Sequence, residues 1–394
     1  MLDAIAAQRA AGRAPPPGLS ELVCEWGRIG CIGFGGPPAH IALLRELCVT
    51  RRDWLSDHEF EDAIAATNLL PGPASTQLAI YCAWRLRGIT GAIVGGLSFI
   101  VPGLILILAL AALFLASSPP TWVLGAGAGS GAAVAAVALQ AAASLAPASW
   151  RRAATRSRWA LYALAGGSSA ATMGVWLVLV LLACGAIEVT LRRAQPNHGA
   201  AGVHAAPLLA AAVAATGGLL ALSWVAFKVG ALSYGGGFVI IPLMQHDAVD
   251  TYHWMTDGQF LNAVALGQVT PGPVVHTIAV VGYAAAGLGG GLLAATIAFA
   301  PSFSFVLIGA ERFDRLRANP TVRAFLDGTG PAAIGAIAGA AIPLALALTE
   351  TWQFAVLATA VLALFALRRG VVLTLVAAGA AGAVASAFGA PLPR

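Results

Sequence analysis

The sequence predicts an all-α protein that crosses a membrane many times and consists of two homologous halves. Two observations support this prediction. Apolar residues make up 59% of the 394 residues and charged residues only 10%, whereas about a quarter of the residues of an ordinary soluble domain are charged. The chain also matches itself when it is shifted by 200 residues, which is the signature of an internal repeat.

Long apolar stretches supply the expected membrane segments. Seven of them contain no Asp, Glu, Lys or Arg: 89–116, 122–149, 159–187, 205–227, 258–310, 328–349 and 370–393. Since a membrane-spanning helix needs roughly 20 apolar residues, the stretch 258–310 is long enough for two, and with the shorter segments we expect about ten to twelve membrane segments. We expect helices, because the strands of membrane β-barrels are short and alternate in polarity.

The rest of the composition argues against other protein classes. Residues 1–19 show no apolar core followed by a cleavage site, so we predict a cytosolic tail rather than a secretory signal. The net charge of +5 comes from arginines in short loops, as expected for loops retained in the cytoplasm, and no nucleic-acid partner is predicted. The five cysteines form no CxxC pair, so we predict no disulfide framework, no metal site and no cofactor.

The repeat divides the chain into a first membrane half, 20–191, a linker, 192–207, and a second membrane half, 208–394. The shift places FGG at 34–36 on YGG at 234–236 and PGP at 71–73 on PGP at 271–273. With a one-residue slip it also places Gly88 on Gly287. Repeated halves of this kind are common in secondary transporters.

The basic loops indicate how the halves are oriented. Four arginines lie within 151–158, and the corresponding part of the second half, near Thr349, has no basic residue; four more lie within 312–323, and the corresponding loop 117–121 is neutral. If positive loops stay inside, the two halves cross the membrane in opposite senses. Such inverted repeats place a binding site near the middle of the membrane.

A pair of glycine motifs predicts broken helices, GFGGPPAH at 33–40 and SYGGGF at 233–238. Consecutive glycines permit backbone conformations that interrupt a helix. The freed N–H and C=O groups then need protein or a water-filled cavity around them. The binding residues predicted here are Gly35, Gly36, Gly235 and Gly236. The alternative is close helix packing through small residues.

A second pair of motifs contains Pro-Gly-Pro, NLLPGPASTQ at 68–77 and QVTPGPVVHT at 268–277. Each PGP interrupts the segment, and the helix that restarts after it has unpaired N–H groups at the positive end of its dipole, which favours an anion. The predicted binding residues are Asn68, Gly72, Ser75, Thr76, Gln77, Gln268, Gly272, His276 and Thr277. Gly72 and Gly272 are expected at helix breaks that approach each other. A simple hinge is the alternative.

Ionisable residues beside these motifs are further candidates, because charge inside a membrane is costly. Arg28 and Lys228 occupy equivalent positions just before the glycine motifs, and two cations from two halves would neutralise an anion better than either alone. The alternative is that each side chain extends to a lipid headgroup, or that Arg28 pairs with Glu25 three residues earlier on the same helix.

Histidines near the motifs are candidates for proton coupling, because histidine titrates near neutral pH. They are His40, His246 and His276, with Asp247 as the suggested partner of His246. The alternative is that these histidines are neutral hydrogen-bonding residues.

In combination, LPGPAST, YGGGF, TPGPVVHT and the segment WLSDHEF at 54–60 resemble the chromate ion transporter family, over nearly the whole chain. The resemblance implies chromate efflux that confers chromate resistance, with sulfate as a competing or alternative ion. It also implies a multi-pass protein of the bacterial cytoplasmic membrane, with the lipid bilayer as its surroundings. The sequence leaves open whether the protein forms a homodimer.

Rival functions from two classes, enzymes and other transport proteins, stay open at this point. The sequence has no HExxH, GxSxG or Walker motif, so an intramembrane enzyme or an ATP-driven pump has little support, and no catalytic residue is predicted. A passive anion channel or a sulfate transporter is the closer rival to a secondary active carrier.

Overall fold

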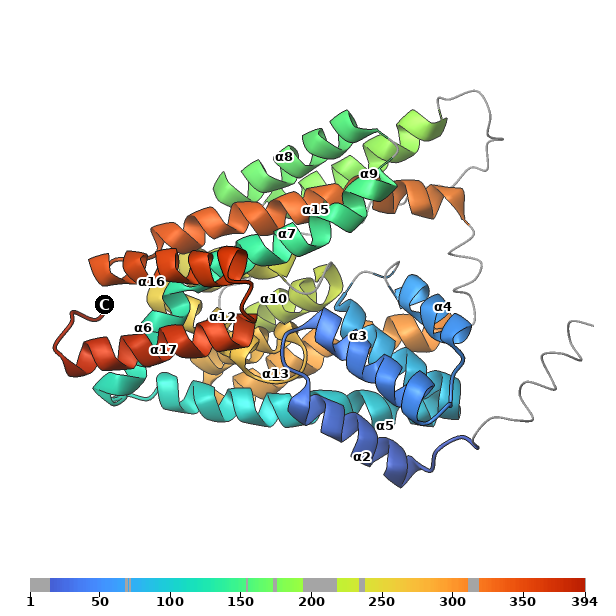
Figure 1. The fold of residues 1–394 in the computed structure, drawn as a ribbon, viewed down its shortest axis with the longest axis horizontal. Coiled ribbons are helices and arrows are strands. Elements are labelled where there is room, and N and C mark those ends of the chain that lie inside the picture. Colours follow the sequence, from blue (N-terminus) through green and yellow to red (C-terminus); the bar gives the residue numbers. More distant parts are fainter. Residues whose placement is uncertain are drawn as a thin grey trace, which may run out of the picture.

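The computed structural model describes residues 15–67, 70, 72–153, 155–172, 176–193, 218–233, 238–310 and 319–393. Within these ranges the regular structure is helical and contains no strand. Figure 1 shows long helices that run side by side along the longest axis of the molecule. The predicted tail and most of the predicted linker lie outside the described residues.

Among the described residues, the first half contains eight labelled α-helices and one π-helical segment. They are α2 (Leu19–Ile32), α3 (Pro37–Arg45), η1 (Glu46–Arg51), α4 (Asp57–Thr67), α5 (Ala74–Phe114), α6 (Thr121–Ala132), α7 (Val134–Arg152), α8 (Arg156–Thr172) and α9 (Leu177–Arg193). The second half contains α10 (Leu219–Leu232), η4 (Phe238–Ile240), α11 (Ile241–Gln245), η5 (His246–Thr251), α12 (Asp257–Val269), η6 (Val274–His276), α13 (Thr277–Gly309), α15 (Pro320–Leu346), α16 (Thr351–Val361), η8 (Leu362–Ala366) and α17 (Val371–Ala387).

The helices confirm the two homologous halves. The π-helical segments η1 and η5 start at Glu46 and His246, so the same backbone irregularity recurs after 200 residues. The glycine turns recur as well, because Gly88 and Gly287 both have φ of 62°. A repeated irregularity is stronger support for homology than repeated apolar composition, which any membrane protein shows.

Each of these glycine turns folds a long helix back on itself. A straight helix of the 41 residues of α5 would be about 60 Å long, twice the apolar thickness of a bilayer. Instead the chain reverses at Gly88, and a β-carbon at Gly91 would overlap the carbonyl oxygen of Ala83. The arms of α13 approach in the same way at Gly282 and Gly290, so both segments are helical hairpins.

In the part of the chain that the structure describes, four helical stretches are long and apolar enough to cross a membrane: 74–114, 121–151, 274–309 and 320–346. Three shorter apolar helices, 219–232, 351–366 and 371–387, accompany them. Outward-facing side chains are apolar, and Ile105, Leu164, Leu220 and Leu346 are between 65% and 78% exposed. The structure therefore has the apolar outer surface of a membrane protein. The number of segments predicted, about ten to twelve, includes helices too short to span alone and stays a prediction.

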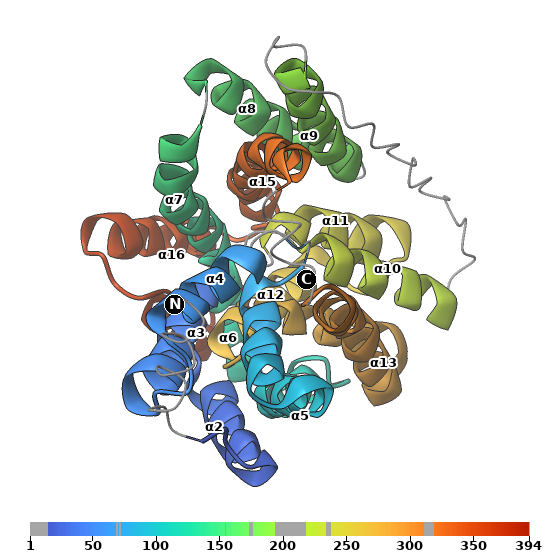
Figure 2. The same ribbon diagram turned by 90° about the vertical axis from the view of Figure 1, so that its right-hand side faces the viewer.

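The two halves exchange helices. In the second half, α15 packs on α7, α8 and α9 of the first half, while α6 of the first half packs on α17 of the second (Figure 2). Glycines permit the closest of these contacts, since a β-carbon at Gly166 of α8 or at Gly335 of α15 would overlap the facing backbone. Packing thus crosses the predicted boundary at 192–207, and each half completes the other.

Candidate functional site

The interrupted motifs of the two halves meet inside the protein. Gly72 and Gly272 lie between helices, with φ of 119° and 94°. The Gly272 amide donates a 2.9 Å hydrogen bond to the carbonyl oxygen of Gly33, which joins the PGP motif of the second half to the glycine motif of the first. On the other side, a β-carbon at Gly72 would lie 3.4 Å from the carbonyl oxygen of Gly230.

His40 fixes this crossing from α3. Its Nε2 lies 2.8 Å from the carbonyl oxygen of Gly33, and its Nδ1 lies 3.2 Å from Ser75 Oγ. Because a carbonyl only accepts, Nε2 carries the proton, and Nδ1 accepts from the serine hydroxyl. The ring also packs edge-on against Phe99, with 5.1 Å between centroids. This geometry fits a neutral hydrogen-bonding histidine, the alternative given above, and leaves proton coupling untested.

His276 sits on the opposite side of the same crossing. It is fully buried and packs against Phe299 with 5.2 Å between ring centroids. Among the described residues neither ring nitrogen makes a well-formed hydrogen bond, although the backbone of Ile100 interacts with the ring. Thr76 Oγ1 and Gln268 Nε2 are likewise buried with no hydrogen-bond partner in the described part of the chain.

A cavity of about 1010 Å³ begins at these motifs. Its inner wall includes Gly35, Gly36, Gly72, Ala74 and Gln268, and its sides are formed by α7 and α15. Two helices start here, but α3 begins with Pro37 and Pro38, which carry no N–H, and the amides of Ala39 and His40 donate to the carbonyl oxygen of Gly36. Only α5, which begins after Pro73, has first-turn amides that are not used within the helix. The inner wall therefore presents the N-terminus of α5 and the amide side chain of Gln268.

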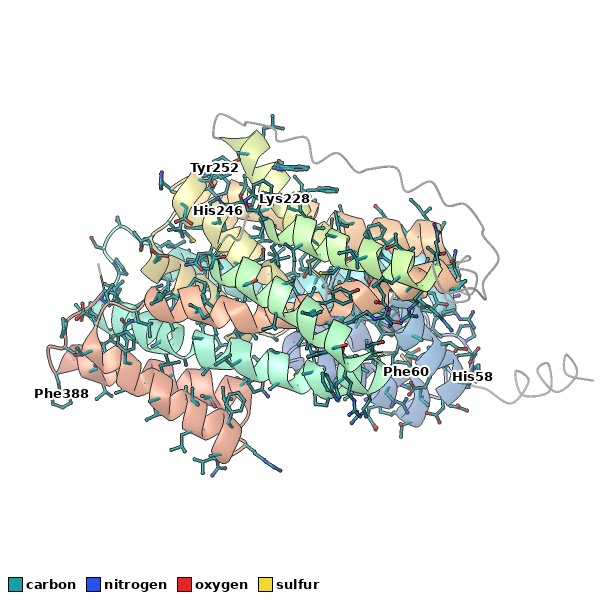
Figure 3. The ribbon with its side chains drawn as sticks, turned by 90° about the horizontal axis from the view of Figure 1, so that it is seen from above. His58, Phe60, Lys228, His246, Tyr252 and Phe388 are labelled. Carbon is teal, nitrogen blue, oxygen red and sulfur yellow. The ribbon has the colours of Figure 1, made fainter. Side chains whose placement is uncertain are left out.

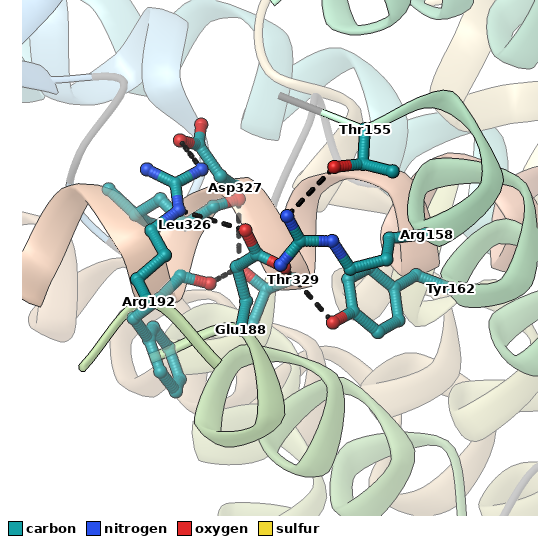
Figure 4. A network of polar contacts seen from close by, with 9 residues as sticks. Thr155, Arg158, Tyr162, Glu188, Arg192, Leu326, Asp327 and Thr329 are labelled. Atoms are coloured by element: carbon teal, nitrogen blue, oxygen red, sulfur yellow. Dashed lines mark hydrogen bonds and ion pairs between the residues drawn. The ribbon is translucent and has the colours of Figure 1, made fainter. Parts of the chain in front are cut away.

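Charged residues line the far end of this cavity (Figure 4). Glu188 of α9 accepts hydrogen bonds from Arg158 Nη1 at 3.1 Å, from the Tyr162 hydroxyl at 3.1 Å and from Arg192 Nε at 2.8 Å. Arg192 Nη2 also donates to Asp327 of α15 at 2.7 Å. We call Arg158, Tyr162, Glu188, Arg192 and Asp327 the cavity cluster. Arg323 lines the same cavity.

Sequence reasoning missed the cavity cluster, because it treated Arg158 as a loop residue and passed over the others. One signal was present. Glu188 is the sole acidic residue between Asp62 and Asp247, and it follows directly on a charge-free stretch. A lone carboxylate at such a position is costly unless it is paired, which makes it a candidate for function.

A second cavity, of about 550 Å³, lies at the other end of α15. Pro343, Leu346 and Ala347 of α15 line it, together with the acidic residues Asp250 and Asp257. The larger cavity uses α15 from Arg323 to Ile337. The helix α15 thus lines both cavities, one of which is lined with arginines and the other with aspartates.

Comparison with known proteins identifies the family. Residues 20–189 and 220–383 both match the profile of the chromate transporter family. The chain belongs to the chromate transporter family. It is 34% identical to the chromate transport protein of Cupriavidus metallidurans over 84% of either chain. It is 31% identical to the chromate transport protein of Pseudomonas aeruginosa over 93% of this chain and 92% of that one. No solved structure matches it.

Membership of this family indicates the functional class and the location of the protein. Its matched relatives are named as transport proteins, so it is a transporter rather than an enzyme in class. The apolar helices agree with the family in identifying a multi-pass protein of the bacterial inner membrane. The resemblance to this family that the sequence motifs indicated is confirmed.

The structure does not bring Arg28 and Lys228 together at the cavity. Arg28 is 57% exposed, with its Nη1 3.8 Å from Glu25. Lys228 Nζ donates to Asp247 Oδ2 at 2.6 Å. Neither cation is part of the lining of the two cavities. We call these two interactions the helix-end ion pairs.

Glu25 has stronger partners than Arg28. Arg51 and Arg52 both donate to its carboxylate, and Arg52 does so at 2.8 Å. The hydrogen bond to Glu25 raises the pKa of Arg52 above its ordinary value. Arg52 therefore stays charged, and Glu25 needs no charge from Arg28.

The suggested pairing of His246 with Asp247 is wrong. His246 Nδ1 lies 3.2 Å from Asp250 Oδ2, one helical turn away, and Asp247 instead pairs with Lys228. Neighbours in sequence point to different sides of a helical segment, which is why Asp247 turns inward and His246 turns outward. Figure 3 shows Lys228, His246 and Tyr252 gathered in one region.

The remaining predicted residues lie at the first turns of the restarted helices. Ser75, Thr76 and Gln77 are buried at the start of α5, and Thr277 is buried at the start of α13. Thr277 Oγ1 donates to the carbonyl oxygen of Val274 at 2.8 Å. Asn68, Gly235 and Gly236 lie outside the described residues.

Proposed function

We propose that this protein is a secondary active carrier that exports chromate from the cytoplasm through the larger cavity, with sulfate as a competing ion. The observation that supports this most is the continuity of that cavity from the cavity cluster to the PGP and glycine motifs. A dianion that loses its hydration needs many donors at once. Arginines at one end, and the N-terminus of α5 with the Gln268 amide at the other, supply them along one path.

The charges of the two cavities favour export. The larger cavity has three arginines, Arg158, Arg192 and Arg323, and two carboxylates in its lining. The smaller one has Asp250 and Asp257 and no arginine or lysine among its described lining residues. A basic mouth attracts an anion and an acidic mouth repels it. Loading at the basic end and release at the acidic end is therefore the favourable direction.

The separation of the cavities supports a carrier over a channel. Along α15 the lining of the larger cavity ends at Ile337 and that of the smaller one begins at Pro343, six positions further on, which is about 9 Å at the rise of an α-helix. A channel needs a continuous path in its open state, whereas a carrier opens one side at a time. The runner-up remains a passive anion channel, which predicts flux that only follows the gradient.

The inverted arrangement of the halves is part of this proposal. His58 and Phe60 of the first half lie at one end of the long axis, while Tyr252 and His246 of the second half lie toward the other (Figure 3). Equivalent segments at opposite ends support halves that cross the membrane in opposite senses. The basic mouth, which includes Arg158 next to the predicted cytoplasmic loop, then faces the cytoplasm.

Cysteine labelling tests this topology. We expect single cysteines at Arg156 and Arg317, in a chain whose native cysteines are replaced, to resist an impermeant maleimide applied from the periplasm. A cysteine at Asp250 should react, because the acidic mouth faces outward. Reaction at Arg156 would contradict both the orientation and the direction of export.

Transport itself is tested in sealed proteoliposomes that contain the purified protein. Chromate should accumulate against its gradient when a membrane potential or a proton gradient is imposed, and sulfate should slow it. Flux that follows only the chromate gradient would support the channel. Absence of any chromate or sulfate flux would remove the proposed function.

A further inference from the structure

Glu188 is the most enclosed charged group of the cavity cluster. Its side chain is 4% exposed, whereas those of Arg158 and Arg192 are 23% and 31% exposed. All three side chains line the cavity, and the two guanidinium groups are more exposed there than the carboxylate that they hold.

We propose that Glu188 is an internal anion that occupies Arg158 and Arg192 until an incoming oxyanion replaces it, and that the displaced carboxylate then takes up one proton. This inference rests on the proposed function, because it names the binding chemistry of that cavity. It gives the oxyanion a site on α8 and α9, and it couples oxyanion binding to proton binding.

The donor geometry fits such an exchange. Glu188 Oε2 accepts from Arg158 and from the Tyr162 hydroxyl, and Oε1 accepts from Arg192. Two guanidinium groups and a phenol are also suitable donors for a tetrahedral oxyanion, because planar guanidinium forks match two oxygens at once. The carboxylate therefore occupies donors that a chromate or sulfate ion would use.

The charges around Glu188 explain why a proton follows the oxyanion. From α8 it faces Arg158 and Tyr162 and from α9 Arg192, the thiol of Cys184 lies near Tyr162, and α15 contributes Asp327 and Arg323 to the same cavity wall. An incoming dianion that takes over Arg158 and Arg192 leaves the carboxylate of Glu188 without either of its cations. A proton on Glu188 removes this uncompensated negative charge. Uncompensated charge in such an enclosed place is costly.

A purely structural clamp would behave differently. Glu188 also ties α8 to α9, and Arg192 ties α9 to α15, so the cluster stabilises the fold whatever else it does. A clamp would keep its ion pairs when the oxyanion binds, and no proton would be taken up. Proton stoichiometry therefore separates the two roles.

The first measurement uses the wild-type protein. Chromate is titrated into purified protein by calorimetry, in mildly alkaline buffers of two different ionisation enthalpies, where chromate itself is a dianion. We expect uptake of about one proton per chromate bound, and an affinity that falls about tenfold per pH unit in the range where this proton is taken up. Chromate binding without proton uptake would overturn the inference and leave the proposed function standing.

The second measurement uses Glu188→Gln, which keeps the shape of the side chain and cannot take up the proton. We expect chromate binding without proton uptake and with an affinity that no longer changes with pH. The matched control is Glu21→Gln, which removes a carboxylate that pairs with Arg52 and lies outside the cavity lining. This control should keep the wild-type proton count.

The outcomes separate the hypotheses. Proton uptake that persists in Glu188→Gln would overturn the assignment to this residue. If Glu188→Gln does not fold, the wild-type proton count still decides whether coupling exists, and Tyr162→Phe, which removes one donor to the carboxylate, should shift the pH at which affinity begins to fall. Failure of the wild type to bind or transport chromate and sulfate would instead remove the proposed function.

Discussion

Arg158 and Arg192 share one carboxylate, Glu188, at the wall of a cavity of about 1010 Å³. Lys228, in contrast, has Asp247 as its own partner, and it is absent from the lining of either cavity. The cavity cluster therefore holds its arginines in the wall of a cavity that a ligand can enter, whereas the pair of Lys228 and Asp247 lines neither cavity. A charged residue that is close to a motif in the sequence is not thereby close to the ligand. The residues that surround it in the folded protein decide whether it lines the cavity.

The largest effect is expected from Arg192→Gln. The change removes donors to Glu188 and Asp327 and leaves both carboxylates without this cation at the basic mouth. Loss of one partner of an enclosed charge pair costs about 2 kcal/mol or more, so chromate transport should fall about 30-fold. Initial rates in proteoliposomes, scaled to reconstituted protein, measure it.

The neighbouring arginine provides the control for this variant. Arg193→Gln should change transport less than twofold, since Arg193 is outside the cavity lining and makes only a 3.5 Å contact with Thr321. Equal losses in both variants would mean that general positive charge, rather than the cavity cluster, attracts the oxyanion.

A smaller effect is expected from Gly272→Ala, which tests the crossing of the motifs. Gly272 has φ of 94°, and an added β-carbon would lie 3.0 Å from the His276 ring. Besides a backbone cost of about 1–2 kcal/mol, the added β-carbon would push on the His276 ring and disturb the hydrogen bond from Gly272 to Gly33 at the crossing. A further loss of about 1.4 kcal/mol at the crossing corresponds to a tenfold fall in transport.

Gly287→Ala is the matched control for the crossing. Its φ is also positive, at 62°, but an added β-carbon would have no neighbour within 4 Å. The backbone cost is thus similar, whereas the motif crossing is untouched. If Gly287→Ala reduces transport as much as Gly272→Ala does, the loss reports backbone strain and not the site.

Lys228→Met should affect stability more than transport. Asp247, whose side chain is 9% exposed, would lose its cation, which costs about 3 kcal/mol for a buried pair. The melting temperature in detergent should fall, while transport per folded molecule stays within about threefold of wild type. The double change Lys228→Met with Asp247→Leu should recover stability, because no unpaired charge remains.

This variant also decides between the sequence-based expectation and the cavity. If Lys228 holds the substrate, as its position before the glycine motif predicted, transport would fall as sharply as in Arg192→Gln. That result would mean that the Lys228 pair and the cavity cluster do not differ in function, and it would place the oxyanion site at α10.

The smallest effect is expected from Arg28→Gln. Arg28 is largely exposed and lies 3.8 Å from a carboxylate that Arg51 and Arg52 already hold. An exposed ion pair contributes about 0.5 kcal/mol or less, so neither the melting temperature nor transport should change measurably. A clear loss of chromate affinity in this variant would restore Arg28 as a substrate ligand.

The sequence by itself determined the helical membrane fold, the two homologous halves and the family. Long continuous apolar stretches satisfy their backbone hydrogen bonds in lipid by forming helices. The repeated motifs show which residues of the two halves correspond. The positions of Gly72 and Gly272 between helices also follow from local chemistry, because proline and glycine interrupt a helix wherever they occur in this arrangement.

Only the tertiary structure decided which charges face the cavity. Arg158, Glu188 and Asp327 belong to three helices that are distant in the sequence and meet because α15 of the second half packs on α8 and α9 of the first. No local pattern encodes that exchange, since it depends on which small-residue faces fit against each other. Helix packing likewise explains why Asp247 pairs with Lys228 and not with His246. Ion pairs follow distances in space, and distances in space are set by how the helices pack.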